Sequence, residues 1–516
     1  MHISDNEGYH MDKRKRHLAF NTVSSFSYRI VTIVCGFIIP RLILGAFGSE
    51  VNGVLHSITQ FLGIITLLDM GVGAVVQSSL YKPLAEKDID GISKIYVSAS
   101  RFFRRIACIL LLYIVALVFV FPQITKTQFD FQYIAVLIIV ISISSFSQYY
   151  FGIVNSILIQ ADQKGYIQDI LQIATLVGNT IVCAILIKAG ASIQLVRFSA
   201  SMIFLVRPII LHIYVNKHYK IDKTIKYSEE PIKQKWNGMA QHFASFVLTG
   251  TDNIVLTLFS SLSNVSIYSV YSMVVTGVFE LLLSLTNGLF PYLGDMWARN
   301  EKEALEAEFA YTEWLMHNAS ILVFGCTGML IINFVKIYTN GINDANYIQP
   351  WFAIVLVIAY AFRSLRIPYN YLVLAAGHYK QTQSNYIIAM IMNIVISIIA
   401  VFKFGLVGVA VGTLAAMAYQ TIWLARYDYK EFLHASFARF LKQLLFDALL
   451  VVSGVVLSML INVQANSYLM WMLQAVILFC VWISIIILFN VIIYKKRCIK
   501  LIGVIRQLKN KRIKSD

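Results

Sequence analysis

The chain has 516 residues, of which 58% are hydrophobic and only 14% charged, and its formal net charge is +16. About a quarter of the residues of an ordinary soluble domain are charged, so this composition excludes a soluble globular protein and indicates a multi-pass membrane protein. Most of the 43 lysines and arginines lie between the apolar stretches or at their ends. That distribution is typical of topology signals and of contact with anionic lipids, and it does not point to nucleic acid.

The first apolar stretch, residues 18–45, follows the basic run 13–16, which predicts a spanning helix that begins on the cytoplasmic side. Thirteen further stretches are long enough to cross a membrane. They cover residues 52–80, 100–121, 132–158, 168–188, 192–215, 240–262, 265–293, 309–336, 348–374, 383–403, 405–425, 441–462 and 468–494. The sequence therefore predicts an all-α protein of about fourteen transmembrane helices.

The basic residues set the predicted orientation. With both termini in the cytoplasm, 33 lysines and arginines fall in the inner segments and 4 in the outer ones. This asymmetry follows the positive-inside rule. The outer connections are all short, so the sequence predicts no external catalytic domain.

Two groups of six stretches resemble each other, and two more stretches follow them. A shift of 214 positions brings Ala161 onto Ala375 and Asn179 onto Asn393. Both groups begin on the inner side, which predicts a parallel repeat about an axis along the membrane normal. The predicted domains are a cytoplasmic basic tail (1–17), an N-lobe (18–215), a cytoplasmic basic linker (216–239), a C-lobe (240–425), a loop with the last two helices (426–494) and a cytoplasmic basic tail (495–516). The last tail suits either an amphipathic helix on an anionic leaflet or a solvated segment.

Six arginines lie within the predicted spans and away from their inner ends, where an ionised side chain costs at least ~2.5–3.5 kcal/mol and is a functional hypothesis by default. Arg41 and Arg197 lie near the outer face and can extend to water. Four others share a level about 12–17 Å from the inner face, at ~1.5 Å per residue: Arg29, Arg207, Arg363 and Arg366. Because guanidinium groups match phosphate oxygens in bidentate fashion, a cavity with these four predicts a phosphorylated substrate.

Three acids lie at a similar depth: Asp69, Asp252 and Glu280. Asp69 matches Arg29 in the neighbouring predicted helix. The two side chains can form a purely structural ion pair, or the three acids can position arginines or take up a coupling ion. The sequence leaves both interpretations open.

Motifs for catalysis or metal binding are missing. The six cysteines have no CxxC pair, and no GxxxxGK[ST] loop occurs. Four scattered histidines show no ligand spacing, and we expect them at the membrane interface: His56, His242, His317 and His378. The sequence predicts no enzyme activity, no catalytic residue, no cofactor and no metal.

Several segments resemble a known family. They are FGSEVNGVL (47–55), LLDMGVG (67–73) and KPLAEKD (82–88) in the first half, and GTDNIV (250–255), AAGHYK (375–380) and GLVGVAVGT (405–413) in the second. With Arg29 in the first span and the arrangement of six, six and two spans, they resemble the polysaccharide transporters of the multidrug/oligosaccharidyl-lipid/polysaccharide (MOP) exporter superfamily. The resemblance covers nearly the whole chain and does not specify a particular sugar.

The resemblance implies a MATE-like fold, with two six-helix lobes around a cavity that alternates its opening. It also implies a flippase of the bacterial inner membrane, which moves undecaprenyl-pyrophosphate-linked repeat units to the outer leaflet for O-antigen, capsule or exopolysaccharide. Arg29 would then contact the pyrophosphate. The partners implied are the lipid-linked oligosaccharide, anionic lipids and, as a further candidate, the polysaccharide polymerase.

Two alternatives remain. A cation-coupled multidrug exporter of the same superfamily calls for a net acidic cavity, whereas the mid-depth charges number four arginines to three acids. A membrane glycosyltransferase or polymerase calls for catalytic acids on substantial outer loops, which the predicted topology lacks.

Overall fold

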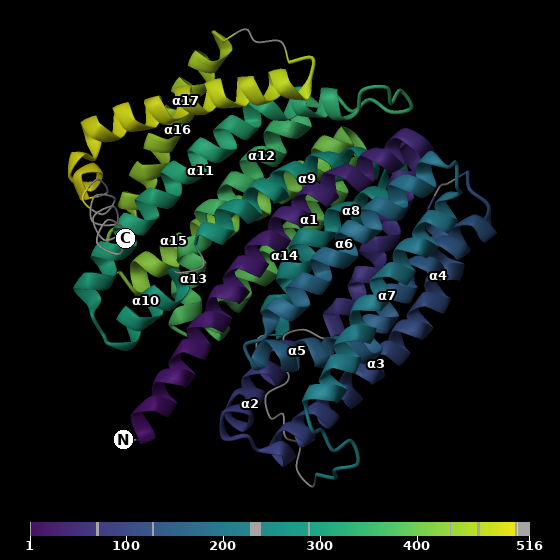
Figure 1. Ribbon diagram of the computed structural model, residues 1–516. Coiled ribbons are helices and arrows are strands. Elements are labelled where there is room, and N and C mark those ends of the chain that lie inside the picture. Colours follow the sequence, from purple (N-terminus) through teal and green to yellow (C-terminus); the bar gives the residue numbers. More distant parts are fainter. Residues whose placement is uncertain are drawn as a thin grey trace. The chain divides into compact units, whose positions relative to one another are not determined.

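The computed structural model describes residues 2–68, 72–125, 128–227, 239–286, 289–433, 435–461, 465–500 and 503. Side chains are described for these residues except 2–19, 74, 239–246, 248, 249, 290, 291 and 298. Throughout these ranges the chain consists of helices and connections, without any strand. The prediction of an all-α protein is therefore confirmed (Figure 1).

Two compact units make up the chain. Unit 1 comprises Met1–Ser266 and Gly341–Ala345, and unit 2 comprises Ile267–Asn340 and Asn346–Asp516. Unit 1 contains α1 (His2–Gly63), η1 (Ile64–Leu68), α2 (Val72–Glu86), α3 (Ile89–Ile124), α4 (Phe131–Ser147), the π-helical turn η2 (Gln148–Gly152), α5 (Ile153–Ala161), α6 (Gly165–Lys188), α7 (Ile193–His218) and α8 (Met239–Phe259). Helix α9 (Leu262–Leu285) begins in unit 1 and continues in unit 2.

Unit 2 holds the remaining helices. They are α10 (Leu289–Ala298), α11 (Lys302–Tyr338), α12 (Pro350–Leu365), α13 (Ile367–Ala375), α14 (Tyr379–Phe404), α15 (Leu406–Glu431), α16 (Ala438–Met459) and α17 (Tyr468–Ile493). Helix α15 packs against both α14 and α12, and α11 packs against α12, α16 and α17. These contacts bury the apolar faces of α11 and α15, which lie at the centre of unit 2.

Helix α1 joins two of the predicted spans. Its φ of 83° at Gly48 is not helical, so two helices meet there at a kink. Glycine suits this position because it has no Cβ, and a Cβ would lie 2.7 Å from an oxygen of Asp344. That carboxylate accepts hydrogen bonds from the N–H and hydroxyl of Ser49, both at 2.6 Å, and so fixes the turn.

Twelve helical segments of the described chain are long and apolar enough to cross a membrane. The first, Phe20–Leu68, has 49 residues and covers the first predicted span and most of the second. Helix α8 has 21 residues and corresponds to the predicted span 240–262. With these taken into account, the described helices agree with the prediction of about fourteen spans, and the chain is a multi-pass membrane protein.

Candidate functional site

The two closely spaced arginines of unit 2 lie at a break between helices. Arg363 is in the last turn of α12, and Arg366 separates α12 from α13. Pro368 lacks the N–H that would continue the ladder of α12, so the helix ends and a new one begins. Backbone bonds from Arg366 N–H to the Phe362 carbonyl (3.2 Å) and from Asn370 N–H to the Arg366 carbonyl (3.0 Å) span the break.

Aromatic and soft side chains surround these guanidinium groups. Arg363 lies 4.2 Å from the ring centre of Phe279 and 5.4 Å from that of Tyr360. Arg366 lies 3.9 Å from the sulfur of Met417, and Tyr386 and Arg363 are the titratable groups that act on it. Among the described residues, neither arginine forms an ion pair with a carboxylate. A guanidinium stacked on a ring keeps its in-plane N–H groups for an oxygen acceptor, so this arrangement is suited to binding an anion.

In unit 1 the predicted arginines occupy different surroundings. Arg29 lies on α1 and is partly buried. Arg207 lies on α7, immediately before Pro208, and donates from Nη2 to the side-chain oxygen of Gln148 at 3.1 Å. Gln148 begins the π-helical turn η2, an irregularity that is common at functional sites. Residues 148–152 contain no pattern from which this turn could be predicted.

The predicted acids are distributed over both units. Asp252 is on α8 in unit 1 and is only 2% exposed. Glu280 is partly buried on α9 in unit 2 and directly follows Phe279, whose ring centre lies 4.2 Å from the Arg363 guanidinium. Asp69 lies outside the described residues, so its predicted pairing with Arg29 stays a prediction. The structure thus brings Arg363, Arg366 and Glu280 into one unit, and a ring of all four arginines also stays a prediction.

Unit 2 also contains a buried polar cluster that was not predicted from the sequence. Glu313 of α11 is 3% exposed and accepts hydrogen bonds from the hydroxyls of Tyr369 (α13) and Tyr429 (α15), the latter at 2.8 Å. Asp428 precedes Tyr429 and has no exposed surface. We call these four residues the Glu313 cluster.

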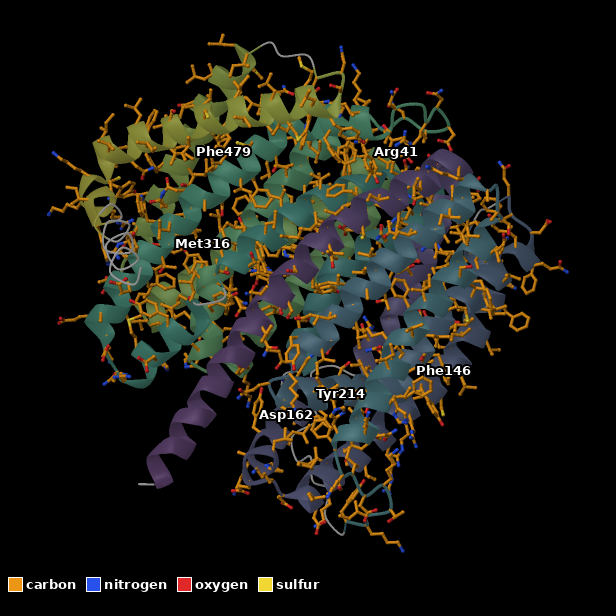
Figure 2. All side chains as sticks on the ribbon, in the orientation of Figure 1. Arg41, Phe146, Asp162, Tyr214, Met316 and Phe479 are labelled. Atoms are coloured by element: carbon orange, nitrogen blue, oxygen red, sulfur yellow. The ribbon has the colours of Figure 1, made fainter. Side chains whose placement is uncertain are left out.

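His317, one helical turn after Glu313, corrects a prediction. It was expected at the membrane interface, but its ring is fully buried and its Nδ1 lies 2.5 Å from Asp447 of α16. Gln443 donates to the other oxygen of Asp447 at 3.1 Å. Figure 2 labels Met316, the residue just before His317 on α11. The spacing of Glu313 and His317, four residues apart in an apolar helix, was the available signal, because such residues share one helix face.

The two ends of unit 1 differ in their side chains. In Figure 2, Arg41 lies at one end, whereas Asp162 and Tyr214 lie near the other. Asp162 accepts a hydrogen bond from the Tyr219 hydroxyl at 2.6 Å and pairs with Lys164 at 2.6 Å. Arg41 was predicted near the outer face and Lys164 in an inner connection, so this separation agrees with the predicted order of the spans.

Solved structures share the fold of this chain. The lipid II flippase MurJ in an inward closed conformation has a TM-score of 0.68 at 15% identity, covering 92% of this chain and 99% of its own. An inward-facing multidrug resistance MATE family transporter of the MOP superfamily has a TM-score of 0.59 at 13% identity, covering 78% and 97%. The eukaryotic MATE transporter AtDTX14 has a TM-score of 0.56 at 11% identity, covering 80% and 95%. No protein-family model matches the chain, and no curated protein matches it in sequence. The predicted MATE-like fold is confirmed.

Proposed function

We propose that this chain is a flippase for lipid-linked oligosaccharides. It would carry undecaprenyl-pyrophosphate-linked repeat units from the inner to the outer leaflet of a bacterial inner membrane, by alternating access, for O-antigen, capsule or exopolysaccharide synthesis. The observation that carries the proposal is the pair Arg363 and Arg366 at the α12–α13 break, held by aromatic rings and a thioether instead of carboxylates.

The chemistry of a pyrophosphate fits this pair. A guanidinium without a carboxylate partner needs an anion to offset its desolvation, and two of them three residues apart suit the two phosphates of a pyrophosphate. The helix break lets the backbone bend where the ligand would be held. The fold supports the proposal because it is similar to that of the lipid II flippase MurJ. Arg29 and Arg207, with Asp252 and Glu280, are proposed as further contacts or charge partners.

A flipping assay tests the proposal. Purified protein is reconstituted into vesicles with a labelled undecaprenyl-pyrophosphate oligosaccharide, and the label that becomes accessible outside is followed in time. Losing one charge-assisted contact costs about 1.5–3 kcal/mol, so we expect Arg363→Ala and Arg366→Ala to weaken apparent affinity roughly ten- to a hundredfold. Arg366→Lys should recover only part of it, because an ammonium cannot bind in bidentate fashion.

Arg426→Ala is the matched control, since Arg426 is exposed near the end of α15. It removes the same charge without touching the α12–α13 break, and it should flip at the wild-type rate. Wild-type flipping by both Arg363→Ala and Arg366→Ala would refute the role of the pair. Transport of a cationic dye, without flipping by the wild-type protein, would favour the multidrug exporter.

A further inference from the structure

The Glu313 cluster is buried and has an unsatisfied carboxyl group. Glu313 has two tyrosine hydroxyl donors, from Tyr369 and Tyr429. Neither oxygen of Asp428 has a hydrogen-bond partner among the described residues, although the side chain is 0% exposed. The charge of Glu313 acts on Asp428, and that of Asp428 acts on Tyr369, so the two carboxyl groups belong to one site.

The positively charged side chains near the Glu313 cluster lie at its edge. No lysine or arginine is fully buried in the described part of the chain. Arg439 and Arg497 act on Tyr429, and Arg439 already pairs with Glu306 at 3.3 Å. Other titratable groups on the surrounding elements include His317 (α11), Tyr427 and Glu431 (α15), Asp447 (α16), Tyr494 after α17, His378 before α14, Tyr386 (α14) and Asp295 (α10), with the exposed Arg426 and Lys430 (α15). His317 is paired with Asp447, and Asp295 with Arg299 at 3.0 Å.

Two neighbouring carboxylates in this setting cannot both be ionised at low cost. Each desolvated charge costs several kcal/mol, and their repulsion adds to that cost at low dielectric. A proton shared between two like acids removes one of the charges. It also turns Asp428 from an unsatisfied acceptor into a hydroxyl that can donate.

We propose that Glu313 and Asp428 form a proton-binding site, which holds one proton at neutral pH and releases it when unit 2 changes conformation. The proton binds to one carboxylate oxygen and leaves to water, so no other reactant is needed. On α11, Glu306 and Glu308 precede Glu313 and form partly exposed ion pairs with Arg439 and Lys500. Water therefore reaches α11 within two turns of the site.

The proton site is connected to the arginine pair through α13. Tyr369, which donates to Glu313, lies three residues after Arg366 and one after Pro368. Helix α15, which carries Asp428, also donates from the Thr421 hydroxyl to the carbonyl of Phe362 at 2.8 Å, just before Arg363. A change of charge at Glu313 alters the acceptor of Tyr369, and thereby the orientation of α13 after the break.

Infrared spectroscopy of the purified full-length protein tests the site without any substrate. A protonated buried carboxyl group has a C=O stretching band that shifts in D2O. We expect this band in the wild type at neutral pH and its loss in the double variant Glu313→Gln/Asp428→Asn, which has neither carboxyl group. Glu306→Gln, a partly exposed position of the same helix, should retain it. Absence of the band from the wild type, or its survival in the double variant, overturns the proposal.

Hydrogen exchange tests the connection to α13. We expect the protection factor of the peptide 367–375, which compares its exchange rate with the intrinsic rate at the same pH, to change with pH in the wild type and to stay constant in Glu313→Gln. Tyr369→Phe removes only the hydroxyl, so it should keep the infrared band and lose the pH dependence of the protection factor. A protection factor that stays pH-dependent in Tyr369→Phe refutes the link. Because neither measurement uses a substrate, the proton site can fail while the flippase proposal stands, and the reverse.

Discussion

Trp482 is held between two glycines. It lies on α17 with 1% of its surface exposed, and its indole N–H donates to the Ser458 hydroxyl at 3.0 Å. A Cβ added to Gly325 of α11 would lie 2.2 Å from the indole ring, and one added to Gly454 of α16 would lie 2.7 Å from it. The two glycines therefore let three helices pack around one large side chain, as small residues do in membrane helix interfaces.

We expect Gly325→Ala to destabilise the protein by about 1–3 kcal/mol, because the rigid indole has no room to move away from the new methyl group. The measurement is thermal unfolding of the purified protein in detergent, followed by tryptophan fluorescence. Gly328→Ala is the control on the same helix, since its Cβ would meet Val357 at an ordinary 3.7 Å. Equal melting temperatures for the two variants would contradict this account of the packing.

Single residues were predictable from the sequence where their chemistry conflicts with an apolar surrounding. Arg363 and Arg366 were predicted in this way, and they lie at the α12–α13 break, while their role stays a prediction. Glu313 and His317 conflict with their surroundings equally, but their partners Tyr369, Asp428 and Asp447 are 56 to 130 positions away. No spacing along the chain predicts which distant side chains will satisfy a buried acid, so the Glu313 cluster needed the structure.

At the scale of elements, the hairpin of α14 and α15 explains the glycine spacing in the segment GLVGVAVGT (405–413). Gly405, with φ of 53°, lies between the two helices. A Cβ on Gly408 would lie 2.3 Å from the carbonyl oxygen of Ala400, and one on Gly412 would lie 2.1 Å from the Ser397 hydroxyl. The Gly-x-x-x-Gly spacing thus places both glycines where α14 and α15 touch, and the motif has a packing role.

We expect Gly408→Ala to push α14 and α15 apart, because the new methyl group meets rigid backbone. Amide hydrogen exchange of peptides from both helices should be faster than in the wild type. Gly178→Ala, on α6 with no atom within 4 Å of its Cβ, is the control and should leave exchange in α14 and α15 unchanged. Wild-type exchange in Gly408→Ala would mean that the close approach does not stabilise the hairpin.

Helix number and order were largely predictable, because hydropathy and length identify spans without tertiary information. The positions at which helices break were less predictable from the sequence. Among the prolines within predicted spans, Pro291 and Pro368 lie in the first turn of a helix that follows a break, whereas α1 and α7 continue past Pro40 and Pro208. Neighbouring helices and side chains decide whether the backbone group freed by a proline is satisfied in place, and the sequence does not give those neighbours.

At the scale of the whole molecule, the topology of the chain determines which end of each helix meets the cytoplasm. The distribution of lysine and arginine predicts that the segment before Tyr227 is inner and that the connection between α11 and α12 is outer. Asp222 is exposed in the first of these segments, and Asn340 is exposed in the second. The same orientation puts the partly exposed ion pairs of Glu306 and Glu308 on the cytoplasmic side, so the proton site would exchange with cytoplasmic water.

Cysteine labelling of intact cells tests this orientation. The six native cysteines are replaced, and Asn340→Cys or Asp222→Cys is introduced into that background. We expect a membrane-impermeant maleimide to label Asn340→Cys in intact cells and Asp222→Cys only after the cells are permeabilised. Labelling of Asp222→Cys in intact cells would show that the topology is the inverse of the predicted one. The Glu313 cluster would then face the outside, and the proton released during transport would leave the cell instead of returning to the cytoplasm.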